Sequence, residues 1–173
     1  MSFAEATESL CMLMLINLVM TIMTYATLTV SSPAFGANTM IPAKFTCEGA
    51  SVSPALHLGE FPSQTRSLAI IVHDPDASHP GGFTHWVAFN IDPVQDIPEG
   101  FKGGVQGLNG GGKAGYTGPC PPTGIHHYHF MVYALDTRLD ISAQTDKAGL
   151  EKAMQGHILA QGDLVGLYKK GQM

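Results

Sequence analysis

The sequence predicts a mainly β domain, and three observations lead to this fold class. Its apolar residues fall in short runs that are rich in branched and aromatic side chains, as strands are. Twenty glycines and eleven prolines are spread between these runs and mark turns. Only one segment has a convincing helical pattern. A chain of 173 residues without repeats or low-complexity linkers is predicted to form one domain with a sizeable core.

Residues 1–26 are predicted to be an apolar leader that precedes the domain at residues 27–173. Residues 10–26 carry no charge and have the length of the apolar region of a secretory signal peptide. The segment before them contains Glu5 and Glu8 instead of the usual positive charges. A membrane anchor and an apolar helix that covers the domain are the alternatives. The protein is therefore expected to be periplasmic or secreted if the leader is cleaved, and cytoplasmic if it is not.

The first half of the domain is predicted to contain four extended segments. Thr27 to Ser32 alternates as a first strand, and Phe45 to Cys47 is a brief second one. Ser53 to Leu58 is extended, because a proline excludes helix for the residue before it. Ser67 to His73 is short and branched enough to be a buried strand, and the turn Asp74-Pro75-Asp76 ends it.

The middle of the domain is predicted to contain two more strands separated by a long loop. Thr84 to Ile91 is a strand that the pair Asp92-Pro93 closes. Ile97 to Lys113 is rich in glycine and shows neither the helical nor the strand periodicity of apolar residues. It is therefore predicted to be loop with at most short strand pieces. His127 to Leu135 is a strand whose two faces are both largely apolar, which places it in the centre of a sheet.

The C-terminal part is predicted to contain the helix and a last strand. The helix runs from about Asp146 to Met154, with Thr145 as its cap and its apolar residues spaced to bury one face. His157 to Gln161 adds a short second turn, and Asp163 to Lys170 is the final strand.

Charge and motif context exclude two classes of ligand. The net charge is -5 with only nine Lys and Arg, so the chain lacks the basic surface that nucleic acids require. Gly107 to Lys113 matches part of a nucleotide-binding P-loop, but Ala114 stands where that motif needs a hydroxyl for magnesium. The motif also lacks its strand before and its helix after, so we interpret it as a chance match.

Polar side chains gather at the ends of three predicted strands. Asp74 and Asp76 follow one strand, His85 begins the next, and His126 and Tyr128 lie on one face of the third. If the three strands are neighbours, an aspartate can orient a histidine and favour its imidazolium form. Protonated histidines, a tyrosine hydroxyl and loop N–H groups then form a small pocket that suits one phosphate or carboxylate group.

Three other interpretations of these residues stay open. His127 and His129 share the other face of their strand at a spacing that metal ligands use, and the two pocket histidines with Asp74 are a second metal set. Either set would suit a metal-dependent hydrolase. Cys120 with His126 is a candidate nucleophilic pair. In the third interpretation the histidines are ordinary core residues with satisfied hydrogen bonds.

The cysteines allow one disulfide. Cys11 lies in the predicted leader, so a cleaved protein keeps Cys47 and Cys120, and this pair could form a bridge in an oxidising compartment. The alternative is two separate small apolar side chains beside the pocket.

Longer segments carry a family resemblance. They are DPDASHPGGFTHW at residues 74–86, GPCPPTGIHHYHF at 118–130 and GHILAQGDLVGLY at 156–168, and the opening LTVSSPAF and IPAKFTCEGASVSPAL fit with them. Together they resemble the phosphatidylethanolamine-binding protein family, specifically its bacterial and archaeal Raf-kinase-inhibitor-like branch. The resemblance spans about Thr27 to the C-terminus.

The resemblance implies a fold and a site. The fold is an antiparallel β-sandwich of a large and a smaller sheet, with one or two short helices near the C-terminus. The family's anion pocket, with the Gly118 to Pro122 loop as part of its wall, maps onto Asp74, Asp76, His85, Pro119, His126 and Tyr128. Where the family usually has H-R-Y this chain has His126-His127-Tyr128, and where it often has D-P-D-A-P the fifth residue is Ser78. Because His127 stands where the family usually has arginine, the site lacks the permanent positive charge of that arginine.

The resemblance also implies a function. Family members bind phosphoryl head groups or other anions, some inhibit kinases or serine proteases by protein contact, and no catalytic activity is generally assigned to the pocket. It therefore implies a non-enzymatic anion-binding protein without a cofactor, whose partners are a small phosphorylated ligand and an inhibited enzyme. A homodimer is a separate expectation. The alternatives are an inhibitor that acts through surface loops and the metal-dependent hydrolase.

Overall fold

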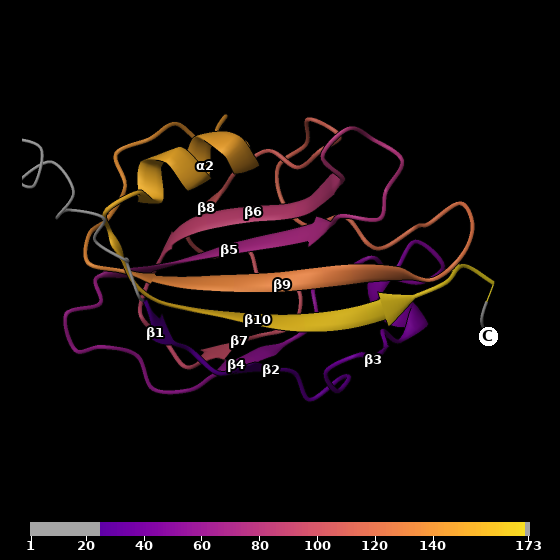
Figure 1. Ribbon diagram of the computed structural model, residues 1–173, viewed down its shortest axis with the longest axis horizontal. Helices are drawn as coiled ribbons and strands as arrows, with labels where there is room; N and C mark the ends of the chain where they lie inside the picture. Colours follow the sequence, from indigo (N-terminus) through magenta and orange to yellow (C-terminus); the bar gives the residue numbers. More distant parts are fainter. Residues whose placement is uncertain (1–24, 172–173) are drawn as a thin grey trace, which may run out of the picture.

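Two β-sheets packed against each other form the protein (Figure 1). The structure is a computed structural model that describes residues 25–171, so the predicted leader lies outside the described residues except for its last two. The large sheet has seven strands in the order β1-β10-β9-β5-β6-β8, with β3 also paired to β10. They are β1 (Ala26–Thr27), β3 (Thr39–Met40), β5 (Ser67–Asp74), β6 (Phe83–Ile91), β8 (Val105–Gln106), β9 (His126–Leu135) and β10 (Ile158–Tyr168). The smaller sheet contains β2 (Val30–Ser31), β4 (Leu56–Leu58) and β7 (Asp96–Ile97).

The predicted sandwich of a large and a smaller sheet is confirmed, but the large sheet is mixed and not antiparallel. Both β1 and β3 run parallel to β10, which itself pairs antiparallel with β9. Between them the chain leaves β10 to form β2, which pairs with β4 in the smaller sheet. The predicted single strand over residues 27–32 is therefore split between two sheets. A local apolar pattern cannot predict this division, because it carries no information about which distant strand is the partner.

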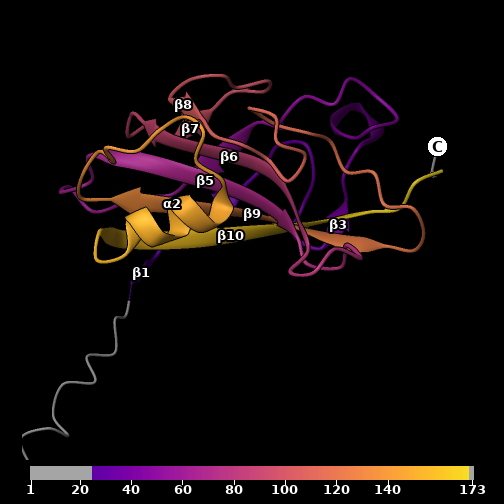
Figure 2. The same cartoon turned by 90° about the horizontal axis from the view of Figure 1, so that it is seen from above.

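The large sheet separates two apolar cores. The first lies between the sheets and contains the fully buried side chains of Trp86, Phe130 and Leu58. The second lies between the large sheet and α2 (Lys147–Met154), where Phe89 is fully buried. Helix α2 lies across the outer face of the large sheet (Figure 1), and Figure 2 shows the same arrangement from above. Strand β9 is central, between β10 and β5, as its two apolar faces predict.

The segment predicted as a strand at residues 45–47 contains a short helical turn instead. A 3-10 turn spans Ala43–Phe45, and its backbone N–H groups at Phe45 and Thr46 donate to the carbonyl oxygens of Pro42 and Ala43 at 3.0 Å. The preceding proline has a fixed φ that suits the start of a helical turn. Phe45 is buried in the core between the sheets, so its apolar character reflects packing and not strand pairing.

The ends of α2 also differ from the prediction. The N-cap is Asp146 and not Thr145, and its carboxylate accepts a hydrogen bond from the N–H of Gly149 at 2.9 Å. Gly156, at φ 80°, turns the chain after the helix. The predicted second helical turn over residues 157–161 is the start of β10, because this segment pairs with the end of β9. None of the helices within residues 25–171 is both long and apolar enough to cross a membrane.

The glycine-rich segment that follows β7 covers the outer edge of β6. Strand β8 pairs with β6 over two residues. Beyond β8, the N–H groups of Gly110 and Thr117 donate to the carbonyl oxygens of Thr84 and His85 at 2.8 Å. The segment that partly matches a P-loop pattern is therefore an edge cover for the sheet, and it leads directly to the wall of the candidate site.

Candidate functional site

A cavity of about 220 Å³ opens where β5 ends and where β6 and β9 begin. The three strand ends lie together because β5 pairs antiparallel with both β6 and β9, so the end of one strand meets the starts of the other two. Four of the six predicted ligand residues line this cavity, namely Asp74, His85, His126 and Tyr128.

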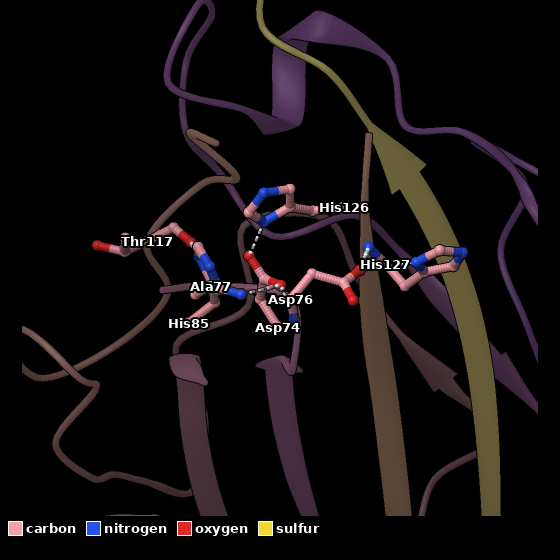
Figure 3. A network of polar contacts seen from close by, with 7 residues as sticks. All are labelled: Asp74, Asp76, Ala77, His85, Thr117, His126 and His127. Atoms are coloured by element: carbon pink, nitrogen blue, oxygen red, sulfur yellow. Dashed lines mark hydrogen bonds and ion pairs between the residues drawn. The ribbon is translucent and has the colours of Figure 1, made fainter. Parts of the chain in front are cut away.

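Asp74 is the central acceptor of the site. Its side chain is almost fully buried, and its Oδ2 accepts a hydrogen bond from Nδ1 of His126 at 2.8 Å (Figure 3). Its Oδ1 accepts from the backbone N–H groups of Asp76 and Ala77, at 2.9 and 3.1 Å. The carboxylate therefore ties the turn after β5 to the start of β9. A buried carboxylate with this many donors is a fixed element of the site.

His126 is held by this carboxylate through one ring nitrogen only. Its Nδ1 carries the proton that is donated to Asp74, and its Nε2 makes no hydrogen bond within the described residues. The residue is 9% exposed, and its ring stacks on that of Tyr128 with ring centroids 6.4 Å apart. In the imidazolium form Nε2–H is a donor, and in the neutral form with this tautomer Nε2 is an acceptor.

His85 is fixed more tightly than His126. Its Nδ1 donates to the carbonyl oxygen of Thr117 at 2.8 Å, and the N–H of Thr117 donates back to the carbonyl of His85. The rings of Phe83 and Tyr128 pack edge-on against it, with centroids 4.9 and 5.2 Å away. Burial lowers the pKa of His85, and the hydrogen bond to the Thr117 carbonyl and the charge of Asp74 oppose this only in part. Burial therefore favours the neutral form of the ring.

Tyr128 carries the one buried polar side-chain atom without a hydrogen-bond partner within residues 25–171, its hydroxyl oxygen. Burial raises the pKa of Tyr128, and the charge of Asp74 and a hydrogen-bonding contact with its carboxylate act in the same direction. No hydrogen bond of normal geometry forms between the two side chains. Since buried hydroxyls normally have a well-formed hydrogen bond, this one is available to a ligand in the cavity.

Asp76 and Pro119 are not among the residues that line the cavity. The carboxylate of Asp76 turns to the opposite face of β9, where it accepts from the backbone N–H and from Nδ1 of His127 at 2.8 and 2.7 Å (Figure 3). These contacts lower the pKa of Asp76. Pro119 is buried behind the wall, and its carbonyl accepts from the N–H of Cys47 at 3.0 Å. Both residues thus support the site from outside the cavity.

Five residues that sequence reasoning missed also line the cavity, namely Ala77, Ser78, His79, Phe83 and Thr117. Phe83 could have been found from the strand period, because it lies two residues before His85 and so on the same face. Thr117 contributes its backbone carbonyl, which has no signature in a sequence. His79 lies in the loop after β5, where no periodicity places a side chain.

A disulfide joins the wall of the cavity to the turn after the 3-10 segment. Cys47 and Cys120 are bonded, with their Cα atoms 5.4 Å apart. Beside the bridge, the N–H of Gly118 donates to Oγ of Ser51 at 2.8 Å. Gly118 packs so closely on Thr46 that a Cβ would lie 2.7 Å from its backbone carbon. The wall is therefore fixed at three adjacent points.

The alternative chemistries find little support in this geometry. Within residues 25–171, no three His, Cys, Asp or Glu side chains come close enough together to hold a metal ion. His127 and His129 each use Nδ1 to bind an aspartate of their own, Asp76 and Asp163, at 2.7 Å. Cys120 is bonded to a second sulfur and so offers no thiolate as a nucleophile.

Burial of the site histidine predicts how stability depends on pH. Burial lowers the pKa of both His85 and His73 in the folded protein. Between the unfolded value of about 6.5 and the lower folded values the unfolded chain binds more protons, so stability falls as the pH falls below about 6.5. We expect the urea midpoint to be lower at about pH 5.5 than at about pH 7.5, and His85→Gln to reduce this difference. An unchanged midpoint across this interval would contradict it.

Comparison with known proteins identifies relatives along almost the whole described chain. The family model for phosphatidylethanolamine-binding proteins matches residues 31–169. A UPF0098 protein of Pyrococcus horikoshii is 51% identical over 150 residues, which cover 80% of this chain and 75% of that protein. A UPF0098 protein of Chlamydia muridarum is 41% identical over 146 residues, covering 81% and 97%.

Two solved structures are similar as well. A phosphatidylethanolamine-binding protein homologue from Chlamydia trachomatis has a TM-score of 0.80 and 39% identity, over 83% of this chain and 98% of that chain. YbcL of Escherichia coli, a member of the mammalian PEBP family, has a TM-score of 0.77 and 30% identity, over 83% and 99%. The predicted resemblance is confirmed: this chain belongs to the phosphatidylethanolamine-binding protein family, in its bacterial and archaeal branch.

Proposed function

We propose that this chain is a non-enzymatic binding protein whose cavity takes a small anionic group, such as a phosphate or a phosphoryl head group. The buried Tyr128 hydroxyl carries the proposal, since it makes no hydrogen bond of normal geometry and a ligand that offers an acceptor would supply one. The family name attributes binding of a phospholipid to members of the family, and the head group of that lipid contains a phosphate.

The charges around the cavity suit one anionic group. His126 donates Nδ1–H to Asp74, which leaves Nε2 free for a ligand, and in the imidazolium form this nitrogen is a charged donor. Tyr128 adds a neutral donor within the same aromatic stack. A cavity of about 220 Å³ is smaller than the pockets that hold drug-sized molecules, which begin at about 300 Å³. It therefore fits a head group better than a long polyanion or a nucleotide.

Tyr128→Phe tests the proposal because it is expected to raise stability and to lower the affinity for an anion. Without a ligand, the change removes an unsatisfied buried hydroxyl, so the free energy of unfolding is expected to rise by about 1 kcal/mol. The affinity for phenyl phosphate, measured by calorimetry, is expected to fall about tenfold because the ligand loses a donor.

The matched control is Tyr116→Phe. The hydroxyl of Tyr116 donates to the carbonyl of Phe45 at 2.9 Å, so its removal is expected to lower stability by about 1 kcal/mol and to leave phenyl phosphate binding unchanged. If Tyr128→Phe binds phenyl phosphate as tightly as the unchanged protein, the hydroxyl has no role in binding and the proposal loses its main support.

A further inference from the structure

We infer that the disulfide between Cys47 and Cys120 is a redox switch for the candidate site, because its reduction releases one half of the cavity wall and so lowers the affinity for an anion. This inference rests on the anion-binding function proposed above and adds a means by which that site is regulated. The wall is the loop over residues 117–125, and its two halves are attached to the rest of the protein in different ways.

The first half of this loop is held by hydrogen bonds. The N–H of Gly118 donates to Oγ of Ser51 at 2.8 Å. The carbonyl oxygen of Pro119 accepts from the N–H of Cys47 at 3.0 Å. Neither bond involves a sulfur atom, so both can persist when the disulfide is reduced. The first half of the wall is therefore expected to stay in place in both redox states.

The second half of the loop has no such bonds. Residues 120–124 make no hydrogen bond with any other residue in the part of the chain that the structure describes. Pro121 and Pro122 have no N–H to donate, and both line the cavity. Regular strand pairing resumes only at His126, where β9 begins. Within the described residues, the disulfide at Cys120 is therefore the one cross-link that holds this half of the wall.

The bridge is accessible to a thiol in the folded protein. Cys47 and Cys120 are both exposed, and exposed disulfides are reduced more readily than buried ones. A dithiol such as dithiothreitol supplies two electrons and two protons. The bond between the two sulfurs breaks, each cysteine becomes a thiol, and the dithiol closes to a cyclic disulfide. Because the bridge is at the surface, this reaction does not require the domain to unfold.

Reduction changes the population of the closed wall. A wall segment without a cross-link samples several conformations, and ordering it again on binding costs conformational entropy. The apparent affinity of a ligand is reduced by the fraction of molecules whose site is competent to bind. If about one reduced molecule in ten has the wall in its closed position, the affinity for an anion falls about tenfold. The oxidised protein does not have this cost.

Calorimetry with phenyl phosphate on the full chain tests this inference. The oxidised protein is compared with protein reduced by dithiothreitol, which is uncharged at neutral pH and so does not compete for an anion site. The reduced protein is expected to bind about tenfold more weakly. By reciprocity, saturating phenyl phosphate should make the bridge harder to reduce by the same factor, which corresponds to about 30 mV in its midpoint potential. Alkylation and peptide mapping verify that Cys47 and Cys120 are the cysteines reduced, and distinguish them from Cys11.

Two variants separate the release of the wall from a general loss of stability. A double variant with Cys47→Ser and Cys120→Ser should bind phenyl phosphate like the reduced protein, with or without dithiothreitol. Leu150→Ala is the matched control, because Leu150 is fully buried beneath α2 and its truncation destabilises the domain without touching the cavity wall. With its bridge intact, this control should bind phenyl phosphate as tightly as the oxidised protein. Circular dichroism verifies that each form is folded.

The outcomes separate this inference from the proposed function. Equal affinities of the oxidised and reduced proteins for phenyl phosphate overturn the switch and leave anion binding intact. A reduced protein that is unfolded also overturns the switch, since the bridge is then required for the fold itself. The same holds if Leu150→Ala binds as weakly as the reduced protein. If neither redox form binds phenyl phosphate, the proposed function is overturned, and the inference with it.

Discussion

Replacing Cys47 and Cys120 together by alanine is expected to lower the free energy of unfolding by about 4 kcal/mol under oxidising conditions. The bridge closes a loop of 73 residues, and cross-linking a loop of this length removes about this much conformational freedom from the unfolded chain. Both cysteines are exposed, so the alanines leave no cavity in the core. The loss in stability therefore reports the covalent bond and little else.

Urea unfolding of the oxidised protein and of the double variant measures this difference. Cys120→Ala alone should lose as much stability as the double variant, since either change breaks the same bond. Treating the unchanged protein with a reductant should bring its midpoint down to that of the variants. If the double variant unfolds at the same urea concentration as the oxidised protein, the bridge does not constrain the unfolded chain as expected.

Asp74→Ala is expected to have an effect of similar size, a loss of about 3 to 5 kcal/mol in stability together with the loss of phenyl phosphate binding. Asp74 is 3% exposed and accepts from His126 and from two backbone N–H groups. Removing one partner of a buried charged pair leaves the other without compensation, which costs this much in other proteins. Without Asp74, Nδ1 of His126 also loses the acceptor that orients its ring in the cavity.

Asp76→Ala is the matched control for this prediction. Asp76 also binds a histidine through Nδ1, but its side chain and that of His127 are 41% and 51% exposed. Exposed pairs contribute about 1 kcal/mol or less, so the control should lose little stability and should keep its ligand. Chemical unfolding and calorimetry on both variants distinguish the two positions. Equal losses of stability in the two variants would mean that burial does not determine how much the Asp74–His126 pair contributes to stability.

The long strands of the large sheet could be predicted from sequence because they are buried on both faces. The predicted strands differ by at most one residue at each end from the observed β5 and β6. This agreement arises because continuous branched and aromatic runs of this length are typical of buried strands. The short strands β1, β3 and β8 could not be delimited. Their existence depends on partners that are distant in the chain, and two residues carry no periodicity.

The candidate site likewise contains residues that the sequence predicts and residues that it does not. Asp74, His85, His126 and Tyr128 lie on or beside regular strands, so strand periodicity and neighbouring ends place them together. Asp76 lies in a turn, where no period determines the direction of a side chain, and it faces His127 on the other side of β9. The Thr117 carbonyl that determines the tautomer of His85 is backbone, and any residue at this position could supply it.

The cover over the edge of β6 has a consequence for how copies of this protein meet at high concentration. A long unpaired strand edge is a template on which a second chain can add its own strand, and this is a common route to aggregation. Here the loop that contains β8 occupies the β6 edge, and two-residue strands with their flanking bonds occupy the edge of β10. Glycine lets that loop lie close to the strand, so the region that partly matches a nucleotide motif protects the sheet from self-association.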